Sequence, residues 1–327
     1  MAISILGAGA WGTAIAISLS SRQDVILWTR NEATFKSISE KKENNILHGC
    51  RIPNNVSIRL NIKDVVNTVT IILAIPTQSL REVCKQLCDC KLQKNIPIII
   101  ACKGIENSTL KLPSEIVREI LPNNPIAIFS GPSFAIEVAK KLPYSTVLAC
   151  QDNKLGLKLI SELLQENVKL HLSNDVIGVQ ICAALKNVFA IACGIILGKK
   201  LGFNAHAALI TKSMNEIKTL YLAKVGNNDT NIDTLFGPSC LGDLVMTCTS
   251  LNSRNMSFGF KIGNSDNSGD IQQILSESKL VIEGVSTAQS VFNLAKKLGI
   301  KMPICEAIYK LLYENASIES TVSVLIS

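Results

Sequence analysis

The feature that most constrains the fold is a glycine pattern close to the first residue of the chain. Gly7, Gly9 and Gly12 form a GxGxxG motif that directly follows the apolar run 2–6 and opens the helix-like run 13–21. In a strand–turn–helix unit the first glycine permits a tight turn, the second lets the backbone approach a pyrophosphate, and the third lets the helix pack closely on the strand. Backbone N–H groups at the helix N-terminus then face the phosphates. Glycine-rich turns also occur for structural reasons alone, but this context predicts a dinucleotide site.

The first half of the chain alternates short apolar runs with amphipathic segments. Continuous apolar runs are typical of strands that are buried on both faces. The runs predicted to be strands are Ala2–Leu6, Val25–Trp28, Val69–Ala74, Ile96–Ala101, Ile126–Phe129 and Thr146–Ala149. Intervening segments such as Ser79–Leu87 and Lys111–Ile120 have a helical pattern. We therefore expect an α/β domain of the Rossmann type, with a doubly wound and mostly parallel sheet.

The second half has long helical segments and few strand-like runs. The predicted helices are Ile177–Leu197, Ala205–Val225, Gly284–Leu298 and Pro303–Tyr313. Gly226, Gly237-Pro238 and the polar stretch Gly263–Gly269 are predicted breaks, and we assign the last of these no role. The 327 residues suit two domains at roughly 150 residues each. We place the boundary near Asn174, a potential helix cap, so that 1–174 is the dinucleotide-binding domain and 175–327 an all-helical catalytic domain.

Charge and cysteine usage exclude some classes of function. The net charge is +7, but the lysines are scattered singly or in pairs, with no basic block of the nucleic-acid-binding type. A small phosphorylated molecule would need only a few of these charges. The eleven cysteines are spread along the chain, many of them inside apolar runs, as expected for reduced thiols in the cytosol. Cys84, Cys88 and Cys90 cluster, but no second pair completes a tetrahedral site, so we expect no metal.

The sequence also bears on membranes and export. The apolar stretch Val188–Leu197 is too short to span a bilayer, which takes about 20 residues. The N-terminus lacks the basic region of a signal peptide. We expect a cytoplasmic protein without a membrane anchor.

Arg30 stands where the second predicted strand ends. An acidic residue there normally binds the ribose hydroxyls of NAD, whereas this chain reads Trp28-Thr29-Arg30-Asn31. Arginine suits the additional 2′-phosphate of NADP. A solvated loop arginine is the alternative interpretation, and the choice between NAD and NADP stays open.

Lys186 and Asn187 interrupt an otherwise apolar helical segment, Ala183–Ala190. A lysine there either extends its amine to the surface or lies in a cleft, where desolvation lowers its pKa into the range useful for general acid–base catalysis. The residues alone do not decide between the two.

Three further segments place polar side chains beside glycines. Lys103 lies in the first, Gly131 and Ser133 in the second, and the third runs from Gly242-Asp243 to Asn255. The first two follow predicted strands, whose carboxyl ends border the ligand crevice of a doubly wound sheet. Ordinary loop chemistry is the alternative for each segment taken singly.

Together these segments resemble the bacterial-type NAD(P)-dependent glycerol-3-phosphate dehydrogenase family. The resemblance runs through nearly the whole chain and rests on GAGAWGTA, LWTRN, ACKGIE, GPSFAIEVAKK, AALKNVFAIACGI, CLGDLVMTCTS, NSRN and VIEGVSTA, in the family's order. It implies a 6-phosphogluconate dehydrogenase-like fold and interconversion of sn-glycerol 3-phosphate and dihydroxyacetone phosphate. In the reductive direction the glycerol 3-phosphate formed would supply phospholipid synthesis.

The resemblance also implies roles for individual residues. Lys186 would be the general acid/base, positioned with Lys103 and Asp243. The residues implied to bind substrate are Lys103, Gly131, Ser133, Lys186, Asn187, Asp243, Thr247, Ser253, Arg254 and Asn255. The residues implied to bind NAD(H) or NADP(H) are Gly7, Gly9, Ala10, Trp11, Gly12, Arg30, Asn31, Lys103, Ala135, Arg254, Val281 and Glu283.

Two departures from the family touch cofactor binding: Ala10 replaces a common serine, and Asn31 a common histidine or other polar residue. The rival activity is that of a 3-hydroxyacid or ketopantoate reductase, whose substrates carry a carboxylate without requiring Ser253-Arg254-Asn255. A dinucleotide sensor without catalysis is a second rival, against which Lys186 and Asp243 argue. The apolar helices of the second half serve either as a dimer interface or as an internal core.

Overall fold

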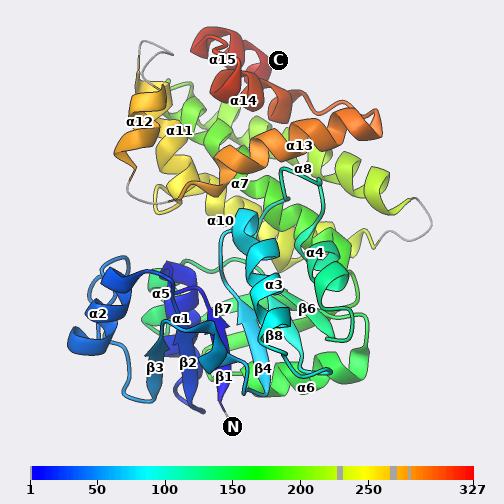
Figure 1. The fold of residues 1–327 in the computed structure, drawn as a ribbon. Helices are drawn as coiled ribbons and strands as arrows, with labels where there is room; N and C mark the ends of the chain where they lie inside the picture. Colours follow the sequence, from blue (N-terminus) through cyan, green and yellow to red (C-terminus); the bar gives the residue numbers. More distant parts are fainter. Residues whose placement is uncertain (1, 227–230, 266–270, 279–280) are drawn as a thin grey trace. The chain divides into compact units, whose positions relative to one another are not determined.

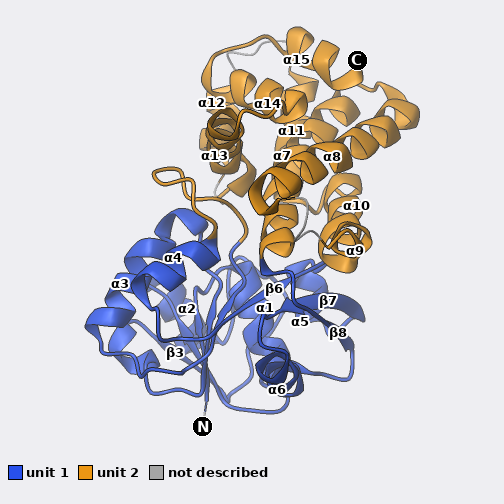
Figure 2. Ribbon diagram, turned by 90° about the vertical axis from the view of Figure 1, so that its right-hand side faces the viewer, with its two compact units in different colours: residues 1–102, 113–176 blue, residues 103–112, 177–327 orange. Residues whose placement is uncertain are grey.

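The structure is a computed structural model that describes residues 2–226, 231–265, 271–278 and 281–327 (Figure 1). It divides into two compact units, coloured separately in Figure 2. Unit 1 comprises residues 1–102 and 113–176, and unit 2 comprises residues 103–112 and 177–327. The segment 103–112, which contains Lys103, therefore packs with the helical unit although it follows a strand of unit 1.

Unit 1 is built on an eight-stranded sheet in the order β3-β2-β1-β4-β5-β6-β7-β8. All neighbouring strands are parallel except β6 and β7. The strands are β1 Ile3–Leu6, β2 Val25–Trp28, β3 Val56–Arg59, β4 Thr70–Leu73, β5 Ile98–Ile100, β6 Ile126–Ser130, β7 Tyr144–Ala149 and β8 Val168–Ser173. The chain reverses direction along the sheet between β1 and β4, so the loops after these two strands lie at the switch point where a doubly wound sheet binds its ligand. The predicted sheet is confirmed.

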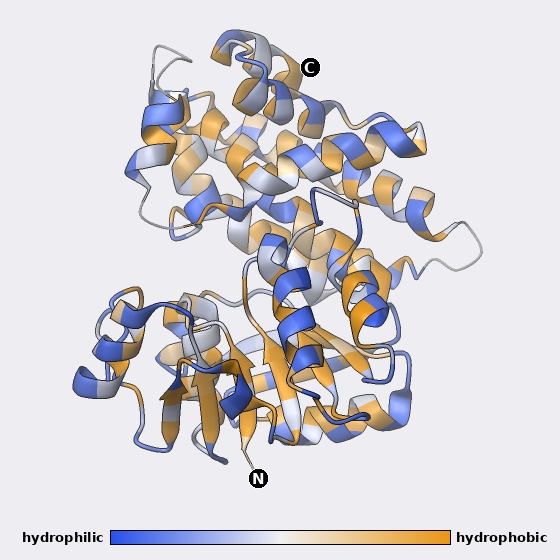
Figure 3. Ribbon diagram, in the orientation of Figure 1, coloured by the Kyte–Doolittle hydropathy of each residue, from blue (hydrophilic) through white to orange (hydrophobic). Residues whose placement is uncertain are grey.

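The two strands missing from the prediction are the outermost ones. β3 and β8 read VSIR and VKLHLS, with polar residues interleaved between apolar ones. An edge strand is less completely covered than a central one, so its sequence lacks the continuous apolar run by which the central strands were found. Orange predominates in those central strands in Figure 3.

Helices cover both faces of the sheet. α1 packs against α5, and α3 packs against α4. Right-handed crossovers that leave β1 and β4 in opposite directions place these two pairs on opposite faces. The helices are α1 Ala10–Leu19, α2 Glu32–Lys41, α3 Leu80–Asp89, α4 Pro113–Ile120, α5 Ala135–Ala139 and α6 Asn153–Leu163, with 3-10 turns η1 Ile62–Val65 and η2 Thr77–Ser79.

Unit 2 is helical throughout the residues that the structure describes. It contains α7 Val176–Gly198, α8 Gly202–Val225, α9 Asp233–Phe236, the π-helical turn η3 Pro238–Gly242, α10 Asp243–Thr249, α11 Arg254–Asn264, α12 Ile271–Glu277, α13 Glu283–Leu298, α14 Pro303–Tyr313 and α15 Ile318–Ile326. Asp175, not the predicted cap Asn174, directly precedes α7. Residues 266–269 of the predicted break Gly263–Gly269 lie outside the described residues.

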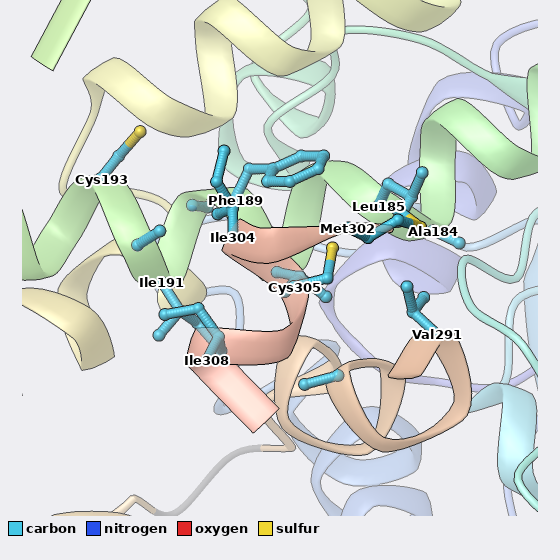
Figure 4. Close-up of a cluster of buried hydrophobic side chains, with 14 of the residues drawn as sticks. Ala184, Leu185, Phe189, Ile191, Cys193, Val291, Met302, Ile304, Cys305 and Ile308 are labelled. Atoms are coloured by element: carbon cyan, nitrogen blue, oxygen red, sulfur yellow. The ribbon is translucent and has the colours of Figure 1, made fainter. Parts of the chain in front are cut away.

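Helix α7 forms the centre of unit 2. It is 23 residues long and therefore extends well beyond the apolar run Val188–Leu197, which alone was too short to span a bilayer. By length and composition alone, α7 could cross a membrane. However, 94% of its most apolar 18-residue window is buried within the protein, as in the core helix of a globular domain. Side chains from α7, α13 and α14 meet there, among them Phe189, Val291 and Ile304 (Figure 4).

Glycines let α7 and α11 approach each other closely. Gly194 and Gly198 lie one turn apart on α7, and Gly259 and Gly263 one turn apart on α11. A Cβ on any of the four would clash with backbone atoms of the other helix. The apolar surface of α7 is thus buried by packing inside unit 2.

Candidate functional site

The glycine-rich loop joins β1 to α1 in unit 1, as the motif predicts. Gly7 has φ +113°, which L side chains rarely adopt, and a Cβ there would clash with the Ala74 carbonyl at the end of β4. A Cβ on Gly12 would clash with the carbonyl of Gly7, which accounts for the close packing of helix on strand. Gly9 differs, because beyond its own chain neighbours nothing lies within 4 Å of where its Cβ would be. The loop thus leaves open space above the second glycine.

The N-terminus of α1 suits an anion. Gly9 is the N-cap and contributes no side-chain cap, so the first N–H groups of α1 have no capping acceptor. A helix that begins without a cap beside open space has the donor set that a pyrophosphate requires. The observed loop therefore fits a bound dinucleotide.

The other residues of unit 1 that were predicted to contact the cofactor have varied surroundings. Trp11 stacks on Phe129, with ring centroids 5.9 Å apart. Arg30 is exposed just beyond β2. Asn31 caps α2, because its Oδ1 accepts a 2.8 Å hydrogen bond from the Thr34 N–H. Ala135 is the first residue of α5. Asn31 thus has a local structural role that the sequence analysis did not recognise.

Gly131 and Ser133 follow β6 in the same unit. Gly131 is buried, and a Cβ there would come within 2.6 Å of the Thr146 Oγ1 on β7. The Ser133 hydroxyl donates to the Gly131 carbonyl at 3.0 Å. Close packing on β7 therefore explains the glycine without reference to a ligand.

The polar centre of unit 2 is a carboxylate held between two lysines. Asp243, the first residue of α10, is fully buried. Its Oδ1 lies 2.5 Å from the Nζ of Lys186 on α7, and its Oδ2 lies 3.0 Å from the Nζ of Lys103. The Thr247 Oγ1, one turn along α10, lies 3.1 Å from the same Lys186 amine. The structure thus brings together four predicted residues that are spread over 145 positions of the sequence.

Burial gives Lys186 an unusual acidity. Desolvation lowers the pKa of its amine, the Asp243 carboxylate opposes that change, and the positive charge of Lys103 adds to it, for a pKa of about 7. Lys186 is 6% exposed, so its amine does not extend to the surface. Of the two interpretations left open by the sequence, the structure therefore supports a desolvated amine.

A chain of amides lies next to this cluster. The Asn255 Nδ2 donates to the Asn187 Oδ1 at 3.0 Å, and the Asn255 Oδ1 accepts from the Gly284 N–H at 2.9 Å. Ser253 caps α11, its Oγ accepting from the Met256 N–H at 3.3 Å. These contacts join α7, α11 and the start of α13.

Arg254 and Glu283 add charge to the same region of unit 2. Arg254 is exposed and donates from Nη1 to the Val281 carbonyl at 2.9 Å. Burial raises the pKa of Glu283, the first residue of α13, while the positive charges of Arg254, Lys103 and Lys186 oppose that change. The guanidinium and two amines are the local cations, and an anionic substrate group suits them.

Asn44 is a further residue beside the glycine-rich loop, and no sequence motif predicted it. Asn44 is buried and contacts the glycine-rich loop of unit 1, yet it lies in an asparagine-rich connection that contains no recognisable motif. Among the residues that the structure describes, no group of three or more His, Cys, Asp and Glu side chains is placed to hold a metal ion.

Family models match both halves of the chain. Residues 2–156 match the N-terminal model of NAD-dependent glycerol-3-phosphate dehydrogenase, and residues 175–323 match its C-terminal model.

Relatives and solved structures agree with the family models. The chain is 76% identical to a glycerol-3-phosphate dehydrogenase (NAD(P)+) from the Wolbachia of Drosophila simulans, over all of both sequences. The solved glycerol-3-phosphate dehydrogenase from Coxiella burnetii is 33% identical, with a TM-score of 0.93 over 100% of this chain and 98% of that one. A ketopantoate reductase from Ralstonia eutropha, 14% identical, has a TM-score of 0.62 over 98% of this chain and 100% of that one, which is a likeness of fold alone.

Proposed function

This chain belongs to the NAD-dependent glycerol-3-phosphate dehydrogenase family, and from that premise we propose that it interconverts sn-glycerol 3-phosphate and dihydroxyacetone phosphate. The cofactor is NAD(H) or NADP(H), and the reduced product supplies phospholipid synthesis. The observation that carries the proposal is the ion-paired group of Lys103, Asp243 and Lys186, in which Asp243 and Lys186 are buried, in a chain of this family. Residues 1–174 hold the dinucleotide, and residues 175–327 carry most of the catalytic groups. Lys103 also belongs to the catalytic group, because it packs with unit 2 although its number falls in the first range.

Lys186 is the general acid/base. When glycerol 3-phosphate is oxidised, the neutral Lys186 amine takes the proton of the C2 hydroxyl. A bound nicotinamide would supply the hydride acceptor for C2 in oxidation and the hydride donor in reduction. In reduction the Lys186 ammonium gives its proton to the oxygen of the carbonyl group. A pKa of about 7 leaves both protonation states populated near neutral pH, as a reversible proton transfer requires.

Asp243 and Thr247 orient this amine. The Lys186 amine donates to two acceptors on α10, the Asp243 Oδ1 and the Thr247 Oγ1. These two hydrogen bonds hold the amine in the orientation in which it exchanges a proton with the substrate. Lys103 compensates the negative charge of Asp243 and offers a second cation to the substrate.

The substrate phosphate binds Arg254, whose planar guanidinium suits a phosphate fork. We also assign to substrate binding Ser253, Asn255 and Asn187, which belong to unit 2, and Gly131 and Ser133, which belong to unit 1. For the cofactor we assign Gly7, Gly9, Ala10, Trp11, Gly12, Arg30, Asn31, Lys103, Ala135, Arg254, Val281 and Glu283. We further propose a cytoplasmic homodimer with no membrane anchor and no nucleic-acid partner.

The direct test is oxidation of NADH and NADPH by the purified chain. Dihydroxyacetone phosphate is offered first, with unphosphorylated dihydroxyacetone and ketopantoate as controls in the same assay. We expect selective turnover of the phosphorylated ketone, and the relative rates with NADH and NADPH give the cofactor preference. Turnover of ketopantoate would replace the proposed substrate, and NADH binding without any turnover would favour a sensor.

Replacement of Arg254 separates the proposal from the reductase alternative. Without the guanidinium, Arg254→Ala should raise the KM for dihydroxyacetone phosphate by roughly tenfold or more, the cost of a lost charge-assisted contact of about 1.5–3 kcal/mol. Arg22, which is exposed in unit 1, provides the matched control Arg22→Ala, and its KM should stay near wild type. An unchanged KM in Arg254→Ala would contradict phosphate recognition by this residue.

A further inference from the structure

Asn44 lies in the connection between α2 and β3, which folds back on itself beside the glycine-rich loop. The Ile52 N–H donates to the Lys42 carbonyl at 2.8 Å and closes the base of the connection. Leu47, Cys50 and Ile52 are buried in the core of unit 1 and anchor it. Asn44 is 2% exposed, so its side chain faces the interior and does not reach solvent.

The Asn44 side chain joins three partners. Its Oδ1 accepts from the Ile46 N–H at 3.1 Å, which orients the carboxamide. Its Nδ2 donates to the Ala8 carbonyl at 2.9 Å and to the Thr13 Oγ1 at 2.7 Å. Ala8 stands between the first two glycines of the GxGxxG motif, and Thr13 lies in the first turn of α1. One buried amide therefore ties the glycine-rich loop to the helix that it opens.

The Ala8 carbonyl and the Gly9 N–H belong to the same peptide unit. A trans peptide is planar, with its carbonyl and N–H pointing in opposite directions. Because Asn44 holds the Ala8 carbonyl towards the interior, the Gly9 N–H points the opposite way, out of the interior. The glycines on either side of Ala8 restrict this peptide unit little by themselves, so an external contact is needed to hold its orientation.

We propose that Asn44 is a positioning residue for the cofactor, holding the Ala8–Gly9 peptide so that the glycine-rich loop is ready to bind the dinucleotide pyrophosphate. The inference rests on the proposed dinucleotide role of this loop. Asn44 acts through the loop, because its amide is buried and donates to Ala8 and Thr13. Its contribution is to lower the ordering cost of binding, which should appear in the affinity for the cofactor and not in the proton transfer at Lys186.

The chain contains a matched control for Asn44. Asn124 is also buried, and its Nδ2 donates to two backbone carbonyls, those of Gln93 and Ile96, at 3.0 and 2.9 Å. It precedes β6 and therefore lies at the amino end of the sheet, whereas the glycine-rich loop lies at the carboxyl end of β1. Asn44→Asp and Asn124→Asp each replace a buried donor by a carboxylate oxygen, with the same change of charge. The new oxygen faces one carbonyl and the Thr13 hydroxyl at position 44, and two carbonyls at position 124.

The experiment measures the dissociation constants of NADH and NADPH by fluorescence titration of the full-length wild type and both variants, together with steady-state kinetics and thermal unfolding. We expect Asn44→Asp to weaken cofactor binding by at least about tenfold, or 1.4 kcal/mol. The cofactor KM should rise in parallel, while kcat at saturating cofactor changes less than about threefold. Asn124→Asp should lower the unfolding temperature by a similar amount and leave both dissociation constants within about twofold of wild type.

Amide hydrogen exchange of the free protein gives a readout that needs no ligand. Exchange in residues 7–13 should accelerate in Asn44→Asp and remain unchanged in Asn124→Asp. If Asn44→Asp does not fold, Asn44→Ser takes its place, with one donor kept on a shorter side chain. Wild-type cofactor affinity in the folded Asn44 variant, or equal weakening in Asn124→Asp, would overturn the inference. Failure of the wild type to bind NADH would instead refute the proposed function.

Discussion

At the scale of single residues, the proposed catalysis depends on Lys186, whose amine is buried where a positive charge is unfavourable. Lys186 is buried, and the Asp243 carboxylate and the positive charge of Lys103 act on it in opposite directions, so neither of its protonation states is strongly preferred near neutral pH. The sequence shows such a lysine in an apolar helix but not the partner that fixes its acidity, because Asp243 follows 57 residues later.

Loss of the Lys186 amine should remove proton transfer and leave cofactor binding intact. We expect Lys186→Ala to lower kcat for reduction of dihydroxyacetone phosphate by roughly 100- to 10,000-fold, the usual contribution of a general acid/base. The NADH dissociation constant, measured by fluorescence titration, should stay within about threefold of wild type. Near-normal turnover would remove Lys186 from the mechanism.

The pKa of Lys186 also predicts that kcat/KM changes with pH in opposite senses for ketone reduction and for alcohol oxidation. Reduction needs the ammonium, so its kcat/KM should fall as pH rises through about 7, whereas oxidation needs the neutral amine and should rise over the same range. In Asp243→Asn the opposing carboxylate is gone, so the midpoint should move to lower pH. Profiles of kcat/KM over roughly two pH units either side of pH 7 measure both midpoints. A midpoint that does not move in Asp243→Asn would contradict this account.

At the scale of secondary-structure elements, helix packing in unit 2 depends on glycine as much as on apolar side chains. α7 and α11 each present two glycines one turn apart, and the backbones of the two helices come into direct contact there. Such contact brings long stretches of both helices together, but it tolerates no side chain at the crossing.

Gly259→Ala should therefore be strongly destabilising. A Cβ at Gly259 would clash with backbone atoms of Ile191. Backbone atoms cannot move aside as a side chain can, so the two helices must separate. We expect a loss of about 2–4 kcal/mol in the free energy of unfolding, measured by denaturant titration, although alanine is the better helix former. Gly237→Ala is the control, since its Cβ would lie 3.5 Å from the nearest atoms, and its stability should change by less than about 1 kcal/mol. Equal stability of the two variants would refute the packing argument.

At the scale of the whole molecule, each unit has a hydrophobic core of its own, and the cysteines belong mostly to those cores. All eleven are free thiols. Cys88 is exposed, Cys90 is half-buried, and the remaining cysteines are buried. Burial raises the pKa of Cys84 to about 12, which keeps this thiol in its unreactive protonated form.

Thiol accessibility should follow this division. With an aromatic disulfide reagent at neutral pH, the native protein should react quickly at Cys88 and more slowly at Cys90, and all eleven thiols should react after unfolding. Mass spectrometry of the modified peptides identifies the sites, and Cys88→Ser should abolish the fast phase. Rapid modification of most cysteines in the native protein would contradict the burial described here.

Much of this protein follows from local sequence. Continuous apolar runs identify the central strands, because a strand buried on both faces needs apolar side chains at every position. The glycine-rich loop is identified by spacing, because each glycine answers a separate steric demand of the turn and helix that follow. The long helices of unit 2 are found from their length and apolar character, and the family resemblance supplies the candidate site residues.

Other features depend on contacts that only the folded chain makes. The edge strands β3 and β8 are defined by their pairing, since polar residues interrupt the continuous apolar run that marks a central strand. Glu216 on α8 accepts hydrogen bonds from the N–H groups of Ile304 and Cys305 at the start of α14, although it is 88 residues away from the first of them. Asn44 and Asp243 likewise acquire their significance from distant partners. The tertiary structure decides these features because a hydrogen bond or ion pair depends on distance in space, which a local sequence pattern does not contain.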